Sequence, residues 1–225
     1  MISIDKNSLL HAYTLTRAVQ KQCPDLPPAV LQTHFLVELF YHILLFRAGK
    51  VPSYPLPFTE DEIIIDRSVI FHQFLKVFDF DQPLSFLKTY KELGIESLLL
   101  LCGQRKTEGS LTTKDAIFPS FKQLLSTFQV PYNTDLSVGC RALSKHFHRT
   151  ADTYWPILTG SPQQKESLAT TTLLRLLKEK TWWNTFEHSI HGTVYEIRVA
   201  SGHGCRWQHT TSNLKFIGFL EPFLK

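Results

Sequence analysis

The clearest alternation of polar and apolar residues lies near the C-terminal end of the chain. Tyr195, Ile197 and Val199 point to one side of an extended segment, and the residues between them point to the other side. After a glycine turn come a second short run, 205–209, and a third apolar run, 214–220. This period of two predicts a small antiparallel sheet that consists of a hairpin and a third strand.

The first two thirds of the chain show helical spacing, interrupted by proline and glycine. Thr59 and Glu62 have the spacing of a capping box, which predicts a helix that extends to about Phe78. Residues 95–103 fit a buried strand and a helical segment equally well. Further helices are expected over Ser8–Gln22, from Pro28 to Ala48 with Gly49 after its end, from Pro83 to Gly94, over 134–150, and from Ser161 to about Trp183.

These patterns together predict an α+β protein, with a mainly helical body and a small C-terminal antiparallel β-sheet. The chain has 225 residues, 43% of them hydrophobic and 17 of them Phe, which is enough to bury a globular core. We expect a helical region over 1–135 and a basic α+β region over 136–225, packed together as one domain.

Positive charge is concentrated toward the C-terminus. Residues 136–225 contain 11 Lys and Arg against 6 Asp and Glu, a net charge of +5, whereas residues 1–135 have a net charge of −1. Six of the ten histidines also follow position 136. An anionic ligand is therefore expected to bind in this region, although a charge of this size is also ordinary for a soluble domain.

Cysteine usage predicts the compartment. The four cysteines lie far apart and form no Cys-x-x-Cys pair, which favours a reducing intracellular setting, cytoplasmic or nuclear. The N-terminus lacks a secretory pattern. The apolar run 35–46 is too short to span a membrane and contains Glu38 and His42, so we expect no membrane association. We also expect no cofactor.

Two histidine patterns raise the question of metal or phosphoesterase chemistry. His146 and His148 would diverge on the predicted helix, because each residue turns by about 100°, so we expect no metal site there. Three His-x-Thr triplets begin at 148, 191 and 209, but only "HGTVY" has the apolar flank that paired phosphoesterase strands show. A metal-dependent hydrolase is therefore a weaker hypothesis than either RNA binding or cleavage or a protein-interaction role.

Two other residue types have an ordinary structural interpretation. Cys140 lies near basic residues that would activate a thiol, but it falls on the apolar stripe of its predicted helix, which indicates a buried cysteine. Trp182 and Trp183 are adjacent and could stack on bases. On a helix they would diverge, so we expect one in the core and the other at the helix end.

The chemistry that the sequence favours most is metal-independent cleavage of RNA. This reaction needs a base, an acid and cations for the phosphorane, which Glu, His and Arg on a small sheet can supply. The predicted catalytic residues are Glu196, Arg198, Arg206, His191 and His203, with His188 and His209 as further histidines nearby. His203 lies in a glycine turn, where a side chain is exposed by default. The alternative is a cross-strand ion pair between Glu196 and Arg206 on an exposed sheet face.

Four further residues are expected to bind nucleic acid: Arg141, Lys145, Arg149 and Lys215. The first three share one face of the helix predicted over 134–150. A solvated basic helix face is the alternative interpretation.

The segments "VYEIRV", "GHGCRW" and "LKFIGFLEPFLK", from about Thr193 to the end, resemble the strand core of the RelE/HigB-type mRNA interferases. Those toxins have a strand with a "YELR"-like run, a glycine turn that leads to an arginine, and a last apolar-aromatic strand. The resemblance implies that Arg198, Arg206 and Lys215 contact RNA phosphates. This chain departs from the family in two ways: some 190 residues precede the similar part, and "FLEPF" stands where lysines are usual.

We therefore expect a nucleic-acid-associated protein that binds or cleaves RNA through the basic helix and the C-terminal hairpin. The alternative is a non-catalytic protein-interaction or scaffold protein, whose helical body docks a protein partner and whose polar hairpin is only solvated.

Overall fold

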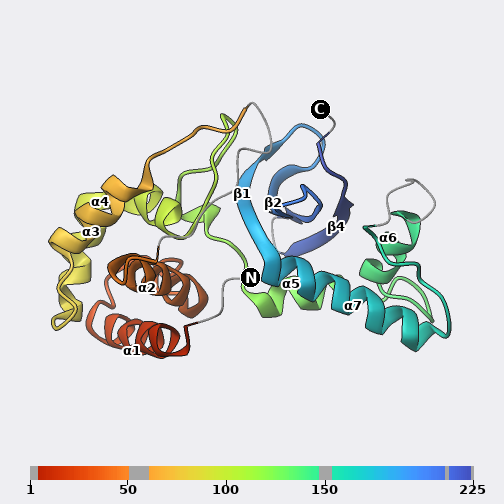
Figure 1. Ribbon diagram of the computed structural model, residues 1–225, viewed down its shortest axis with the longest axis horizontal. Coiled ribbons are helices and arrows are strands. Elements are labelled where there is room, and N and C mark those ends of the chain that lie inside the picture. Colours follow the sequence, from red (N-terminus) through yellow and green to blue (C-terminus); the bar gives the residue numbers. More distant parts are fainter. Residues whose placement is uncertain (1–4, 51–60, 147–153, 211–212, 224–225) are drawn as a thin grey trace. The chain divides into compact units, whose positions relative to one another are not determined.

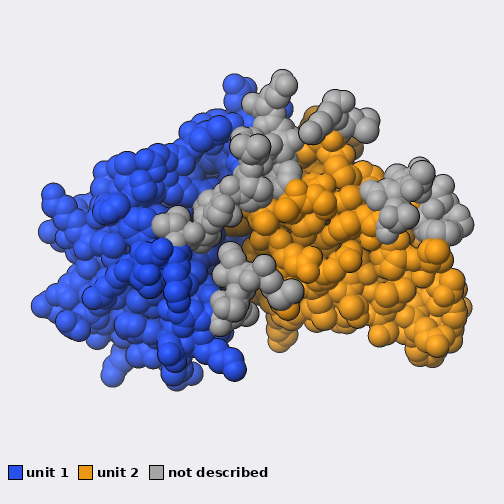
Figure 2. All heavy atoms as spheres, viewed as in Figure 1, with its two compact units in different colours: residues 1–57, 61–118 blue, residues 58–60, 119–225 orange. Residues whose placement is uncertain are grey.

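The computed structural model describes residues 5–50, 61–146, 154–210 and 213–223 (Figure 1). The chain divides into two compact units (Figure 2). Unit 1 comprises residues 1–57 and 61–118, and unit 2 comprises residues 58–60 and 119–225. The described helices and the C-terminal antiparallel sheet confirm the α+β class.

Unit 1 is helical in its described part. It contains α1 (Lys6–Gln22), α2 (Thr33–Arg47), α3 (Arg67–Val77), η1 (Pro83–Ser85), α4 (Phe86–Leu101) and η2 (Lys114–Ala116). The side chain of Asp5 caps α1 by accepting from the N–H groups of Asn7 and Ser8. Buried aromatic rings hold the helices together, among them Phe40, Phe74, Phe78 and Phe86.

Two helix starts in unit 1 differ from the prediction by several residues, and α6 of unit 2 (Val138–His146) begins at Val138 and not at Thr134. Helix α2 begins at Thr33 and not at Pro28, because Val30 and Leu31 both donate to the carbonyl of Pro27 and form a turn. Helix α3 begins at Arg67, where the Asp66 side chain accepts from Ser68 N–H at 2.9 Å. The predicted capping box fails because residues 61–66 are not helical and Glu62 pairs with Arg105; Thr59 lies outside the described residues.

Glycine ends or bends two helices where the sequence indicated a break. Gly49 follows α2 with φ of 71°, as predicted for the residue after a helix. Gly94 has φ of 72° and ψ of 169° inside α4, so the helix from Phe86 stops there and a second helical segment continues to Leu101. The ambiguous run after Gly94 is therefore helical through Leu101.

Three described helices belong to unit 2: α5 (Phe121–Phe128), α6 (Val138–His146) and α7 (Pro162–Glu179). Capping boxes open α5 at Ser120 and α7 at Ser161. The predicted start of α7 is confirmed. Its predicted end near Trp183 is wrong, because the chain turns into a strand at Lys180.

The sheet of unit 2 has four antiparallel strands in the order β1-β2-β3-β4: β1 (Lys180–His188), β2 (Gly192–Val199), β3 (Gly204–His209) and β4 (Leu214–Leu220). The last three are the predicted hairpin and third strand. Strand β1 was not predicted. It pairs with β2 and places Trp182 and Trp183 on opposite faces, both buried, which corrects the expectation that one of them lies at a helix end.

One face of the sheet carries the core of unit 2. Tyr195, Ile197 and Trp207 are buried there, and Phe128 of α5 packs on Phe216 of β4 at 5.0 Å between ring centroids. Helices α5 and α6 contact β4, and α7 contacts β2. The opposite face is also largely buried, but polar side chains, among them Glu196 and Arg198, project from it.

Across the described residues, no helix is both long and apolar enough to cross a bilayer.

Candidate functional site

The strand register brings polar residues from three strands into one row. Asn184 of β1 lies opposite Glu196 of β2, and Glu196 lies opposite Arg206 of β3. Arg198 follows two residues after Glu196, so it projects from the same face. The structure therefore brings together three of the five predicted catalytic residues.

Glu196 is the centre of this row. Its side chain is 1% exposed, and both carboxylate oxygens are paired. Oε1 accepts from Arg198 Nε at 2.6 Å, and Oε2 accepts from Arg206 Nε at 2.7 Å. Arg206 Nη2 also lies 2.6 Å from Oε2. The cross-strand ion pair is thus present, but its carboxylate is buried rather than on an exposed face, and it is paired with two guanidinium groups.

Arg198 is turned toward the protein interior. Its side chain is 3% exposed, and Nη1 donates to the carbonyls of Gly202 at 2.6 Å and Glu221 at 2.9 Å. Its guanidinium carbon lies 3.8 Å from the centroid of the Phe223 ring. Burial lowers the pKa of Arg198, and the Glu196 carboxylate opposes this shift. These contacts tie β2 to the segment after β4.

Arg206 differs from Arg198 because part of it reaches the surface. Its side chain is 14% exposed, and Nε and Nη2 are both directed at Glu196. Within the described part of the chain, Nη1 has no hydrogen-bond partner. The guanidinium therefore has a fixed orientation and one nitrogen left to donate to a ligand.

Two histidines lie at the β1–β2 turn, at one end of this face. The imidazole centroids of His188 and His191 are 5.0 Å apart. His188 Nδ1 accepts from the main-chain N–H of Ile190 at 3.1 Å. Partial burial lowers the pKa of His188, and the positive charges of Arg206 and His191 lower it further, against the opposing effect of Glu196. His188 is therefore neutral near pH 7, with its proton on Nε2.

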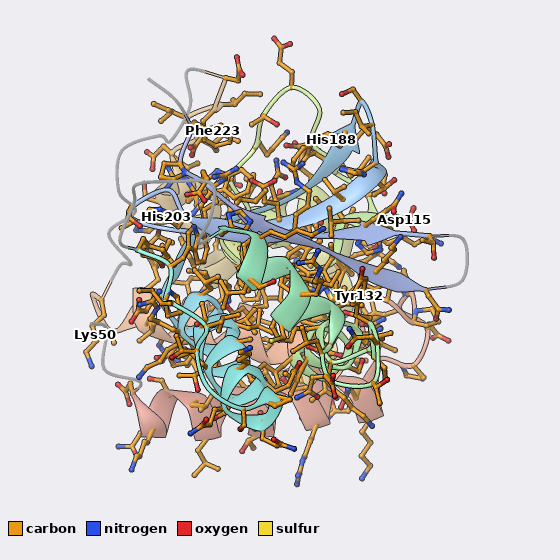
Figure 3. The ribbon with its side chains drawn as sticks, turned by 90° about the vertical axis from the view of Figure 1, so that its right-hand side faces the viewer. Lys50, Asp115, Tyr132, His188, His203 and Phe223 are labelled. Carbon is orange, nitrogen blue, oxygen red and sulfur yellow. The ribbon has the colours of Figure 1, made fainter. Side chains whose placement is uncertain are left out.

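His203 lies apart from this group. It occupies the turn between β2 and β3, whereas His188 and His191 flank the turn at the other end of β2. Figure 3 shows His188 and His203 in different parts of unit 2. His203 is 5% exposed and stacks on Tyr154 at 3.7 Å between ring centroids, so the expectation of an exposed side chain at the turn is wrong.

A cluster around Glu221 was missed by the sequence analysis. Glu221 Oε1 accepts from His146 Nδ1 at 2.7 Å and from Trp155 Nε1 at 2.8 Å, and Oε2 lies 3.5 Å from His203 Nε2. His146 and Trp155 are 75 and 66 residues from Glu221 along the chain. No local pattern could have indicated these contacts, which anchor the segment after β4.

The predicted nucleic-acid-binding residues occupy several elements of unit 2. Arg141 of α6 lies 5.8 Å from the Tyr132 ring centroid, and Lys145 is exposed farther along the same helix. Lys215 of β4 is exposed and pairs in register with Gln208 of β3. Arg149 and His148 lie outside the described residues.

The described residues show neither a reactive thiol at Cys140 nor a group of side chains that could hold a metal ion. Cys140 is buried, and burial together with the nearby Glu166 carboxylate raises its pKa to about 12, which fits the predicted structural thiol. Among the residues that the structure describes, no group of three or more His, Cys, Asp and Glu side chains is arranged to hold a metal ion.

Comparison with known families gives a match to part of the chain. Residues 125–221 match the family model described as the CdiA C-terminal tRNase toxin domain. The matched segment runs from α5 to Glu221 and includes the Glu196 row and the two histidines at the β1–β2 turn. The match supports a toxin nuclease-type family for this part of the chain, and not the RelE/HigB-type interferases specifically. No curated protein and no solved structure matched the chain.

Proposed function

We propose that unit 2 is an RNA-cleaving domain that works without a metal ion. The observation that carries the proposal is the geometry of Arg206. A buried carboxylate holds this side chain and leaves one of its nitrogens open. Its positive charge also acts on His188, whose pKa it lowers. This arrangement falls inside the segment that is similar to a tRNase toxin domain, so transfer RNA is the substrate class that we propose.

Arg206 is assigned to the scissile phosphate. Two of its nitrogens are fixed on Glu196, so the remaining Nη1 is oriented before RNA binds. A preoriented guanidinium loses little freedom on binding and suits the planar recognition of phosphate oxygens. Charge that develops on the phosphorane is stabilised by such a donor more than charge in the ground state.

His191 is assigned to proton transfer. Its imidazole has no hydrogen-bond partner among the described residues, whereas the Nδ1 lone pair of His188 is occupied. His191 takes the proton of the ribose 2′-hydroxyl, the 2′-oxygen attacks phosphorus, and the bond from phosphorus to the 5′-oxygen breaks. The proton is returned through His191 or water to that 5′-oxygen. The products are a 2′,3′-cyclic phosphate and a 5′-hydroxyl.

Neutral His188 donates its Nε2 proton to a phosphate oxygen in this scheme. A neutral imidazole can approach the phosphate beside Arg206. It adds no third positive charge to those of Arg198 and Arg206, which would need a counter-charge when no RNA is bound. The lowered pKa of His188 supports this role, since the group stays uncharged at neutral pH.

Glu196 and Arg198 are assigned to positioning and not to contact with RNA. Both are almost fully buried and both are occupied by protein partners. We assign His203 to the anchoring cluster around Glu221 for the same reason. Arg141, Lys145 and Lys215 are assigned to phosphates away from the cleaved bond.

The test is incubation of the purified full chain with mixed transfer RNA in excess chelator. We expect discrete fragments that end in 2′,3′-cyclic phosphate, and no cleavage of a matched DNA strand, because DNA lacks the attacking 2′-hydroxyl. Cleavage that stops on chelation, or fragments that carry a 5′-phosphate, would contradict the proposed reaction.

A further inference from the structure

Gln208 connects the β1–β2 turn to the strand that carries Arg206. Its side-chain Nε2 donates to the main-chain carbonyl of His191 at 2.7 Å, across 17 residues of chain. Because a carbonyl can only accept, the amide must present its nitrogen here. Gln208 lies two residues after Arg206 on β3, so the two side chains project from the same face.

The turn that holds His191 is closed by the pairing of His188 with Gly192, and few side chains bind its main chain. Ile190 at the turn is 80% exposed, and Gly192 adopts a positive φ of 63°. Within the described residues, the side-chain bonds to the main chain of this turn come from Gln208 and from His188, and His188 is adjacent to the turn itself. Among the described residues, Gln208 is therefore the side chain from outside the β1–β2 hairpin that binds the main chain of this turn.

The register between β2 and β3 is regular from Val194–Gln208 to Glu196–Arg206. Strand β3 thus fixes the positions of both groups that the proposed reaction requires. It carries Arg206 itself, and it contacts His191 through the Gln208 amide. A shift of His191 relative to Arg206 would move the proton acceptor away from the 2′-hydroxyl of a phosphate bound at Arg206.

We infer that Gln208 is a positioning residue for proton transfer by His191. The inference rests on the proposed RNA cleavage. It assigns the positioning of His191 to Gln208, a residue outside the network of Glu196 and its two arginines. Gln208 acts through the His191 main chain, so its removal should slow the chemical step without weakening the capture of RNA by Arg206 and the basic residues.

The experiment compares the full chain with Gln208→Met, which has similar length and no donor. We expect kcat on transfer RNA to fall roughly tenfold, with KM and the melting temperature little changed, as for other groups that orient a reacting residue. Gln20→Met is the matched control, because Gln20 Nε2 donates to the Leu31 carbonyl at the same 2.7 Å in unit 1. This control should leave kcat unchanged.

A second comparison places Gln208→Met in a His191→Ala background under single-turnover conditions with added imidazole. If Gln208 acts through His191, the second substitution has no further effect, because free imidazole does not depend on the turn. An equal loss in both backgrounds would show that Gln208 acts independently of His191 and would overturn the inference. So would an unchanged kcat, or a loss that appears only as a lower melting temperature.

The two proposals fail in different ways. If the unaltered chain does not cleave RNA, the proposed function fails and the inference falls with it. If the unaltered chain cleaves RNA but the Gln208 comparisons give either contrary result, the proposed function stands and the positioning role alone is rejected.

Discussion

Glu196 and its two arginines show how burial sorts chemically similar residues into different roles. Arg198 and Arg206 both bind the same carboxylate, but Arg198 gives its remaining contacts to main-chain carbonyls while Arg206 keeps Nη1 open. The sequence correctly indicated that Glu196 and Arg206 face each other across the hairpin. It could not separate the two arginines, because exposure depends on the segment after β4 and not on the strand pattern.

Cysteine reactivity gives a test at the same scale. All four cysteines are buried, and the pKa of Cys140 is raised to about 12, so very little thiolate exists near pH 8. We expect iodoacetamide at pH 8 to modify none of them in the folded protein and all of them after unfolding in denaturant, as measured by intact mass. Rapid modification of Cys140 in the folded protein would contradict its assignment as a structural thiol.

His34 predicts a pH dependence of stability. Burial lowers its pKa, while its Nε2 lies 2.8 Å from the carbonyl of Phe118. The unfolded chain, with a His pKa of about 6.5, then binds more protons than the folded chain, so the free energy of unfolding falls as pH decreases through this value and levels off below the folded pKa.

In the His34→Gln variant the side-chain amide can keep the bond to Phe118 without titrating. Urea unfolding at pH 7.5 and pH 5.5 should therefore show a smaller loss of stability in this variant than in the unaltered chain. An equal loss in both proteins would show that His34 does not contribute to the acid sensitivity.

At the scale of elements, the hairpin was predictable and β1 was not. The alternation from Val194 to Val199 is local, and the glycine turn after it marks the hairpin. The segment Lys180–His188 follows a strong helical pattern without a proline or glycine break, so its first residues were assigned to the helix. Its strand conformation comes from pairing with β2, which buries both tryptophans, and such pairing is a tertiary effect.

Packing of α6 against α5 gives a prediction for these elements. A Cβ atom at Gly139 would lie 2.2 Å from a ring carbon of Phe128, and Phe128 is fully buried against Phe216. We expect Gly139→Ala to lower the free energy of unfolding by about 1–3 kcal/mol, as overpacking in a core does. Replacing Phe128 with Leu in the same chain should recover part of the loss, measured by urea denaturation. An alanine variant as stable as the unaltered chain would contradict this close contact.

At the scale of the whole molecule, the two units differ in net charge. Unit 2 carries 12 Lys and Arg against 8 Asp and Glu, a net charge of +4, whereas unit 1 carries 12 of each. The sequence placed the positive charge in the C-terminal region, because counting charge needs no structure. The anchoring role of Glu221 needed the structure, since its partners are distant in the chain.

Salt dependence tests whether the charge of unit 2 meets RNA. We expect the logarithm of the RNA binding constant to fall linearly with the logarithm of salt concentration. Replacing Arg141 and Lys145 together with Gln should reduce the magnitude of this slope by about 1.5, as expected for two phosphate contacts on a single strand. The same change at Arg17 and Lys21 of unit 1 is the control. A slope that responds equally to both pairs would place RNA elsewhere.

The most direct measurement of the central claim is the rate of RNA cleavage in chelator by Arg206→Gln, with Arg17→Gln of unit 1 as the matched control. Loss of a preoriented donor to the transition state typically costs about 100-fold to 1,000-fold in rate, so we expect a decrease of that order for Arg206→Gln and none for Arg17→Gln. Equal cleavage by both variants would contradict a phosphate site at Arg206, and with it the proposed active site on this face of the sheet.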